Sequence, residues 1–188
     1  MYRYSLLFVL LFLSLISFSQ PNSKLPEIDK SPMDVSYYPG NYPILKIQNK
    51  AAEPPAARII YSRPQRQGRK VFGELVEYGK VWRLGANEAT EIEFYKEVKI
   101  GGTKVAKGRY TLYAIVTENN WTMIVNKDTD IWGAFKYDPK KDVLRTDITP
   151  QKTDDVAESM SMWFDKTNNG CILNIAWEQV KASLPITL

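Results

Sequence analysis

The fold is decided by residues 90–126, which read TEIEFYKEVKIGGTKVAKGRYTLYAIVTENNWTMIVN. Residues 90–94 alternate strictly between polar and apolar side chains, which is typical of a strand with one buried face. Gly101-Gly102 separates two short strand-like segments and predicts a tight hairpin. Residues 110–116 and 121–126 lie on either side of Glu118-Asn119-Asn120 and predict a second hairpin. This stretch therefore predicts consecutive antiparallel strands.

The same pattern extends to both sides of that stretch. The other expected strands are residues 58–62, 143–149, 159–164, 171–177 and 183–186. Residues 44–47 are a candidate strand in a proline-rich region, and residues 71–78 and 154–160 are candidates for a helical turn or two. No long amphipathic helical pattern is present. The chain is therefore expected to be all-β, an antiparallel β-sandwich or flattened barrel of about 8–10 short strands.

Composition excludes several classes of chemistry. The chain has 188 residues, 44% of them hydrophobic, which suits one domain with a substantial core. It contains no histidine, so Ser-His-Asp and Cys-His nucleophile systems and His-ligated metal sites are excluded. Its single cysteine excludes an intramolecular disulfide and any CxxC motif. We expect no cofactor and no metal. The remaining catalytic chemistry would use carboxylate, lysine, tyrosine or serine side chains.

The first 19 residues have the pattern of a secretory signal peptide. Arg3 precedes an apolar run over residues 6–13, and Ser17 and Ser19 are small residues at the positions that signal peptidase reads. Cleavage is expected before Gln20. Residues 20–44 then form a proline-rich lead-in and residues 45–188 a single β-rich domain. The expected location is secreted or periplasmic, with no membrane association after cleavage.

Positive charge is concentrated in residues 58–83, which hold seven lysines and arginines against two glutamates. Residues 84–188 carry a net negative charge. Arg63 and Arg69 in this segment have the planar fork that suits carboxylate, sulfate and phosphate groups, and aromatic residues are interleaved with them. The segment predicts an anion- or sugar-binding surface. The alternative is that the arginines pair with the acidic remainder of the domain or are simply solvated. With a net charge of only +4, nucleic acid is not expected as a partner.

Two further segments mix side chains that are suited to ligands. Trp82, Arg83, Asn87 and Glu88 lie within seven residues just before a strand, where they either line a pocket or brace a turn through hydrogen bonds. The loop 126–142 contains four aspartates but lacks the spacing of an EF-hand.

The aromatic residues of that loop, Trp132 and Tyr137, are candidates to stack on a sugar or partner, or to cover the end of the sandwich. Elsewhere, Cys171 lies on the apolar face of its strand and is expected to be buried. Tyr110 is expected to act as a tyrosine corner, with its hydroxyl bonded to the backbone.

Several consecutive motifs resemble one family of secreted bacterial proteins. They are Ser62-Arg63-Pro64, residues 68–73, 78–83, 85–90 and 108–112, and Trp132-Gly133-Ala134. In this order they resemble domain of unknown function family 2911, over roughly residues 45–186. The resemblance implies a secreted, β-rich domain of a kind found mostly in Gram-negative bacteria. It implies no activity, substrate or catalytic residue.

Three functions are compatible with these residues. The first is a non-enzymatic binding module for an anionic or carbohydrate ligand or a protein partner, with one face formed by Arg63, Arg69, Trp82, Arg83, Asn87, Glu88, Trp132 and Tyr137. The second is a structural or interaction module whose motif residues only brace loops. The third is a histidine-free hydrolase that uses Glu88 and an aspartate of the 128–138 loop.

Overall fold

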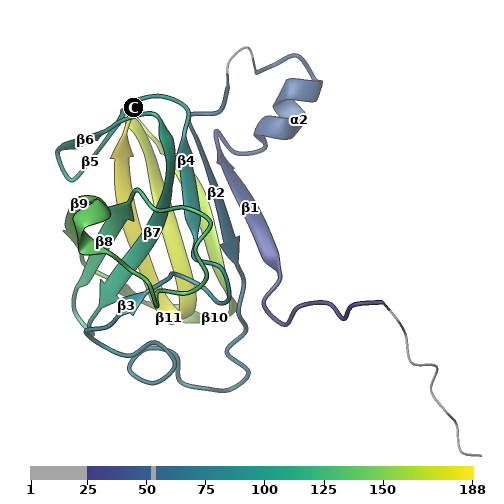
Figure 1. Cartoon of the computed structure of the whole chain (residues 1–188). Helices are drawn as coiled ribbons and strands as arrows, with labels where there is room; N and C mark the ends of the chain where they lie inside the picture. The colour runs from purple at the N-terminus through teal and green to yellow at the C-terminus, as the bar shows by residue number, and fades with distance from the viewer. Residues whose placement is uncertain (1–24, 52–53) are drawn as a thin grey trace, which may run out of the picture.

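The computed structural model describes residues 25–51 and 54–188 and shows two antiparallel sheets packed against each other (Figure 1). The expected signal peptide lies outside these residues. The all-β sandwich predicted from the sequence is confirmed, and it is open at its edges rather than closed into a barrel. The described part of the chain has eleven strands, of which two are much longer than the sequence pattern indicated.

The first sheet has seven strands, in the order β1-β2-β4-β7-β8-β9, with β3 paired to β7. Its strands are β1 (Met33–Tyr38), β2 (Ala57–Ser62), β3 (Val81–Trp82), β4 (Glu91–Phe94), β7 (Gly108–Val116), β8 (Trp121–Asn126) and β9 (Asp142–Ile148). Strand β1 forms the edge of this sheet beside β2, so part of the proline-rich stretch 20–44 belongs to the folded domain.

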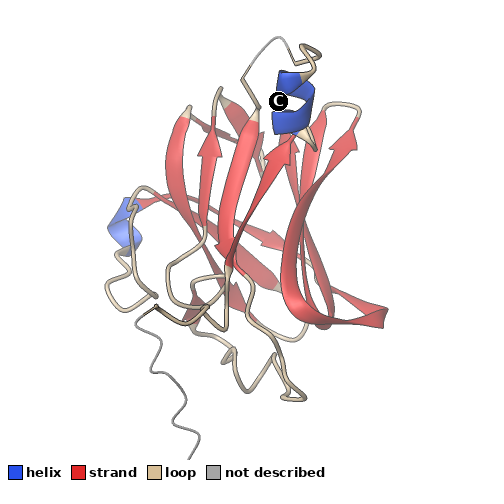
Figure 2. Cartoon of the chain, turned by 90° about the vertical axis from the view of Figure 1, so that its right-hand side faces the viewer, coloured by secondary structure: helices blue, strands red, loops and turns tan. Residues whose placement is uncertain are grey.

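The second sheet has four strands, in the order β10-β11-β5-β6. Its strands are β10 (Gln151–Thr167), β11 (Gly170–Thr187), β5 (Val98–Ile100) and β6 (Thr103–Val105). The β10–β11 hairpin runs the length of the domain and forms most of the second layer (Figure 2). The strand expected over residues 183–186 is the continuation of β11.

The two hairpins expected from turn residues are both present, and the structure adds a third between β10 and β11. Gly101 and Gly102 have φ of 55° and 82°, which glycine adopts at low cost, and they join β5 to β6. Residues 117–120 join β7 to β8, and Asn168-Asn169 joins β10 to β11. Local turn chemistry therefore determines the pairing of these neighbouring strands.

The core lies between the sheets and is rich in aromatic residues. The rings of Phe72, Trp82, Trp121 and Trp177 pack together, with Trp82 stacked on Trp177 at 6.2 Å. The Tyr110 hydroxyl donates to the Ala106 carbonyl at 2.9 Å, as expected for a tyrosine corner. Cys171 is buried on the inner face of β11, as predicted.

Three local expectations were wrong. Residues 44–47 belong to the helix α2 (Tyr42–Ile47), which begins after Asn41 and has Pro43 in its first turn, where the missing N–H of proline is tolerated. Residues 154–160 are not a helical turn but part of β10, where the pairing of Ala157 with Glu178 of β11 overrides the local pattern. Residues 71–78 form turns closed by a bridge between Phe72 and Val76.

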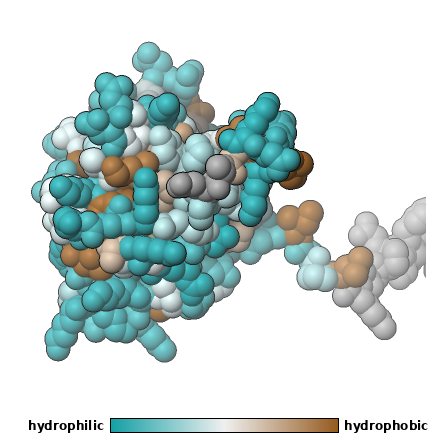
Figure 3. Space-filling model, turned by 90° about the horizontal axis from the view of Figure 1, so that it is seen from above, coloured by the Kyte–Doolittle hydropathy of each residue, from teal (hydrophilic) through white to brown (hydrophobic). Residues whose placement is uncertain are grey.

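The remaining short helix is the 3-10 helix η1 (Pro139–Lys141). None of the helices in the described part of the chain is long and apolar enough to cross a membrane. The face that carries α2 is mostly hydrophilic, with hydrophobic residues in small separate groups (Figure 3). The long β2–β3 connection lies at the opposite end of the sandwich (Figure 1).

Candidate functional site

Most arginines of the basic segment 58–83 are bound within the domain. Arg58 lies opposite Glu93 in the β2–β4 pair, and its Nη2 is 2.6 Å from the Glu93 carboxylate. Arg69 donates from Nε to the Arg66 carbonyl at 2.8 Å and from Nη2 to the Gln65 carbonyl at 2.7 Å. The guanidinium of Arg69 therefore holds its own loop, although its side chain remains exposed.

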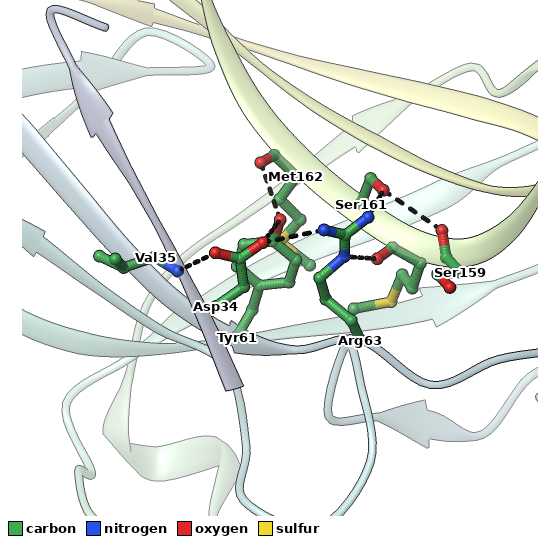
Figure 4. Close-up of polar contacts among 8 residues, drawn as sticks. Asp34, Val35, Tyr61, Arg63, Ser159, Ser161 and Met162 are labelled. Atoms are coloured by element: carbon green, nitrogen blue, oxygen red, sulfur yellow. Dashed lines mark hydrogen bonds and ion pairs between the residues drawn. The ribbon is translucent and has the colours of Figure 1, made fainter. Parts of the chain in front are cut away.

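Arg63 is the centre of a polar network that joins both sheets (Figure 4). Its Nη1 is 3.1 Å from Asp34 Oδ2, its Nε donates to the Met160 carbonyl at 3.1 Å, and its Nη2 donates to Ser161 Oγ at 2.9 Å. All three nitrogens of the guanidinium thus have protein partners. Arg63 connects β1 to β10, and this supports a bracing role for it.

Arg83 differs from these arginines. It follows β3 directly and is partly buried, and none of its side-chain nitrogens bonds to a described residue. Its Nε is sealed from solvent and has no hydrogen-bond partner in the part of the chain that the structure describes. Burial without a nearby counter-charge lowers the pKa of the Arg83 guanidinium from its ordinary value. An unpaired, partly desolvated cation is costly and is a recognised feature of functional sites.

Arg83 lies between two adjacent hollows, of about 300 Å³ and about 220 Å³. Both hollows are lined by Leu75, Val76, Trp82 and Arg83. The larger one is completed by Ala134 and Phe135 and is called the Phe135 hollow below. The smaller one is completed by Arg69, Pro64 and Trp177, among others, and is called the Arg69 hollow. Together they form the Arg83 groove.

Trp82 contributes to this groove from the core. Its side chain is only 7% exposed, and its Nε1 donates to the Gly85 carbonyl at 3.3 Å. The ring is held by Phe72, Trp121 and Trp177, so its position is fixed before any ligand arrives. Trp82 is therefore a rigid wall of the groove as well as a core residue.

Asn87, Glu88 and Trp132 form a second group. Asn87 donates from Nδ2 to Asp29 Oδ2 at 2.9 Å, and its carbonyl accepts from the Gly133 N–H at 2.9 Å. Glu88 and Trp132 pair through a short backbone bridge. Asn87 thus braces the loop, as the structural alternative predicts, while the Trp132 side chain is 60% exposed. None of these three residues lines the Arg83 groove.

Tyr137 belongs to a third group. Its hydroxyl donates to Asp142 Oδ2 at 2.6 Å and accepts from Arg145 Nη2 at 2.6 Å, while its ring packs edge-on against Tyr113. Burial, followed by the hydrogen bond to Asp142, raises the pKa of Tyr137 to about 12. This residue covers the outer side of β7 and β8 and does not line the groove.

Three carboxylates share a separate hollow of about 160 Å³, namely those of Glu88, Glu91 and Asp130. This places Glu88 and an aspartate of the expected loop at one hollow. Arg109 forms ion pairs with both Glu91 and Asp130, however, so two of the three carboxylates are already neutralised. No group of three or more acidic or cysteine residues arranged to hold a metal ion occurs in residues 25–51 and 54–188.

The sequence-predicted residues therefore separate into groups. Arg69, Trp82 and Arg83 line one hollow, whereas Arg63 is bonded within the network of Figure 4 and does not line it. The sequence analysis did not identify the apolar lining, above all Leu75 and Phe135, which are 43% and 86% exposed. The one signal for them in the sequence was that both are large apolar residues in segments rich in turn and charged residues.

Comparison with known proteins provides a family and no activity. A family model described as protein of unknown function (DUF2911) matches residues 44–186. No curated protein and no solved structure matches the chain. The function must therefore be argued from the geometry of the groove.

Proposed function

The chain belongs to the DUF2911 family of proteins of unknown function. We propose that it is a binding domain for an anionic ligand that pairs with Arg83. The family description includes no substrate or catalytic residue. The matched region, residues 44–186, contains the whole Arg83 groove apart from Ser31. The proposal therefore concerns a feature that lies within the family domain.

One observation carries this proposal: the Arg83 side chain has no partner among the described residues, whereas Arg58 and Arg63 are each paired with a carboxylate. A guanidinium removed from water loses hydration free energy that hydrogen bonds or a counter-charge normally restore. Because the fold provides neither to Arg83, an incoming anion would gain the full charge-assisted interaction. Carboxylate, phosphate and sulfate groups all match the guanidinium fork.

The structural alternative explains other motif residues better than it explains Arg83. Arg63, Arg69 and Asn87 all make hydrogen bonds that hold loops or strands together. Arg83 makes no such bond from its side chain, so bracing does not account for a charge at this position.

We further propose a secreted or periplasmic location. The support is the sequence pattern of residues 1–19, in which one arginine precedes an apolar run and small residues precede Gln20. Expression of the full chain in a Gram-negative host, followed by N-terminal sequencing of the periplasmic fraction, tests it. A mature terminus at Gln20 supports the location, and retention of the uncleaved chain in the cytoplasm contradicts it.

The binding proposal is tested by thermal shift with phosphate, sulfate, carboxylates and acidic glycans. A ligand present at one hundred times its Kd stabilises by about 2.7 kcal/mol, which corresponds to roughly 5–10 °C for a chain of this size. Arg83→Met keeps the aliphatic stem and removes the charge, so every anion that stabilises the wild type should lose its effect. An anion that stabilises both proteins equally would contradict the assignment to Arg83.

A further inference from the structure

The Phe135 hollow combines a mostly polar lining with two large apolar side chains that are exposed to solvent. Leu75 and Phe135 stand at the hollow with 43% and 86% of their surfaces exposed, and Val76 and Ala134 complete the apolar lining. Exposed apolar side chains that cluster at a concave site gain free energy when a ligand covers them. The groove therefore offers apolar contacts as well as a charge.

The ring of Phe135 lies against a glycine of its own loop. Gly133 has φ of +69°, and a Cβ at residue 133 would lie 2.7 Å from the Phe135 ring. The ring therefore packs directly against the Gly133 turn, in space that a side chain would fill. This arrangement limits where an otherwise exposed ring can go.

The charges along the groove favour a single anionic group rather than a cation. Lys80 and Arg83 line the Phe135 hollow against one acidic residue, Glu77. Arg69 and Arg83 line the Arg69 hollow, where no acidic residue contributes. Arg83 is common to both, so an anion bound there has the Phe135 ring on one side and a second arginine, Arg69, on the other.

We propose that the ligand of the Arg83 groove is a small amphiphilic anion, whose head group pairs with Arg83 and whose apolar chain or ring lies between Leu75 and Phe135. This inference rests on the proposed function and adds the ligand class. Fatty acids and alkyl phosphates share this chemistry. Arg83 is partly buried in a hollow, so we expect a free molecule that enters the groove rather than a flat bilayer surface.

The test is a chain-length series measured by isothermal titration calorimetry on the purified protein. Acetate, butanoate, hexanoate and octanoate are compared below their micelle concentrations, with inorganic phosphate and octyl phosphate as a second head group. Each buried methylene contributes about 0.8 kcal/mol, so affinity should rise about fourfold per methylene until the hollow is full. A series with no dependence on chain length overturns the proposal.

Variants separate the apolar contact from the charge. Phe135→Ser and the double variant Leu75→Ser/Phe135→Ser should weaken octanoate about tenfold or more and leave acetate unchanged. Gly133→Ala should weaken octanoate in the same direction, because its Cβ displaces the Phe135 ring. Trp132→Ser is the matched control, since Trp132 is exposed in the same loop but does not line the groove. Equal octanoate affinity in Phe135→Ser and in the wild type overturns the proposal.

The outcomes also distinguish this inference from the proposed function. If Arg83→Met abolishes binding of acetate and phosphate but chain length has no effect, the proposed anion site at Arg83 is supported. The proposal that the ligand is amphiphilic is then contradicted. If Arg83→Met binds octanoate as tightly as the wild type, the proposed function itself is wrong. Binding to phosphatidylglycerol vesicles without binding to monomeric octanoate or octyl phosphate would contradict the proposal of a free ligand. It would indicate that the groove binds a membrane surface instead.

Discussion

Asp34 and Arg63 are joined by an ion pair of 3.1 Å between Oδ2 and Nη1, and this contact fastens the edge strand β1 to the sandwich (Figure 4). The Tyr61 hydroxyl lies 3.3 Å from the same carboxylate oxygen and 3.1 Å from the Met162 carbonyl. Asp34 Oδ1 also accepts from the Val35 N–H, which occupies a backbone donor of an edge strand. Strand β1 precedes the family-matched region, so this network attaches an additional strand to the family domain.

Replacing Asp34 should therefore loosen β1 more than the rest of the domain. Asp34→Ala is expected to lower the free energy of unfolding by about 1 kcal/mol, because the pair is partly exposed and Arg63 keeps two other partners. Hydrogen exchange should accelerate mainly in residues 33–38. Asp154→Ala on the exposed part of β10 is the control, and equal effects of the two substitutions would contradict the role of Asp34.

The Tyr137 hydroxyl makes stability sensitive to alkaline pH. The pKa of Tyr137 is raised to about 12, whereas an unfolded tyrosine titrates near 10, so the unfolded state releases its proton first as the pH rises. The contribution of the Tyr137 hydroxyl to the free energy of unfolding is fully present below pH 10 and is lost as the pH approaches 12. In urea unfolding, the free energy of unfolding of Tyr137→Phe should decrease less over that pH range than that of the wild type.

Burial, followed by the charges of Asp128 and Asp142, also raises the pKa of Tyr113 to about 12, so the decrease persists in part after the substitution at residue 137. Tyr78→Phe is the matched control, because Tyr78 is an exposed tyrosine, and it should follow the wild-type curve. Parallel curves for the wild type and Tyr137→Phe would show that Tyr137 does not contribute.

Cys171 reports on opening of β11. Its side chain is 1% exposed, and burial raises the pKa of its thiol to about 12, so the native protein presents almost no thiolate at pH 8. Reaction with Ellman's reagent should be at least about 100-fold slower in the native than in the urea-unfolded protein, which corresponds to an opening free energy of about 3 kcal/mol or more. Rapid stoichiometric labelling of the native protein would contradict the placement of Cys171.

The parts of the fold that could be predicted are those determined by residues adjacent in sequence. The alternation of residues 90–94 and the turn at Gly101-Gly102 each determine one element locally, and the structure has both. The length of β10 and the identity of residues 42–47 were not predictable in this way. The length of β10 depends on pairing with β11, which is distant in sequence. The helix at residues 42–47 depends on Pro43 in its first turn, although the apolar pattern there also suits a strand.

The candidate site was predictable in its residue types and not in its geometry. The sequence identified Arg63, Arg69 and Arg83 equally, because all three lie in one basic segment. Only the structure shows that the first two are bonded and that Arg83 is not. Whether Arg83 has a partner depends on every segment that packs around it, and these segments are far apart in sequence. Phe135 was missed because its exposure beside Gly133 depends on how the loop turns.

The binding and bracing roles of Arg83 make opposite predictions for stability without ligand. Arg83→Met removes a desolvated charge that has no partner and retains the packing of the aliphatic stem. We expect the free energy of unfolding to stay the same or to rise by about 1 kcal/mol, as is common when a functional charge is removed. Urea titration of the ligand-free protein measures this difference.

Arg58→Met is the matched control, because the Nε of Arg58 is also sealed from solvent without a partner, but its Nη2 pairs with Glu93. That substitution leaves the partly buried Glu93 carboxylate without its cation and should lower the free energy of unfolding by about 1–3 kcal/mol. If Arg83→Met were destabilising to the same extent as Arg58→Met, Arg83 would be bracing its loop. The Arg83 groove would then lose the observation on which an anion site depends.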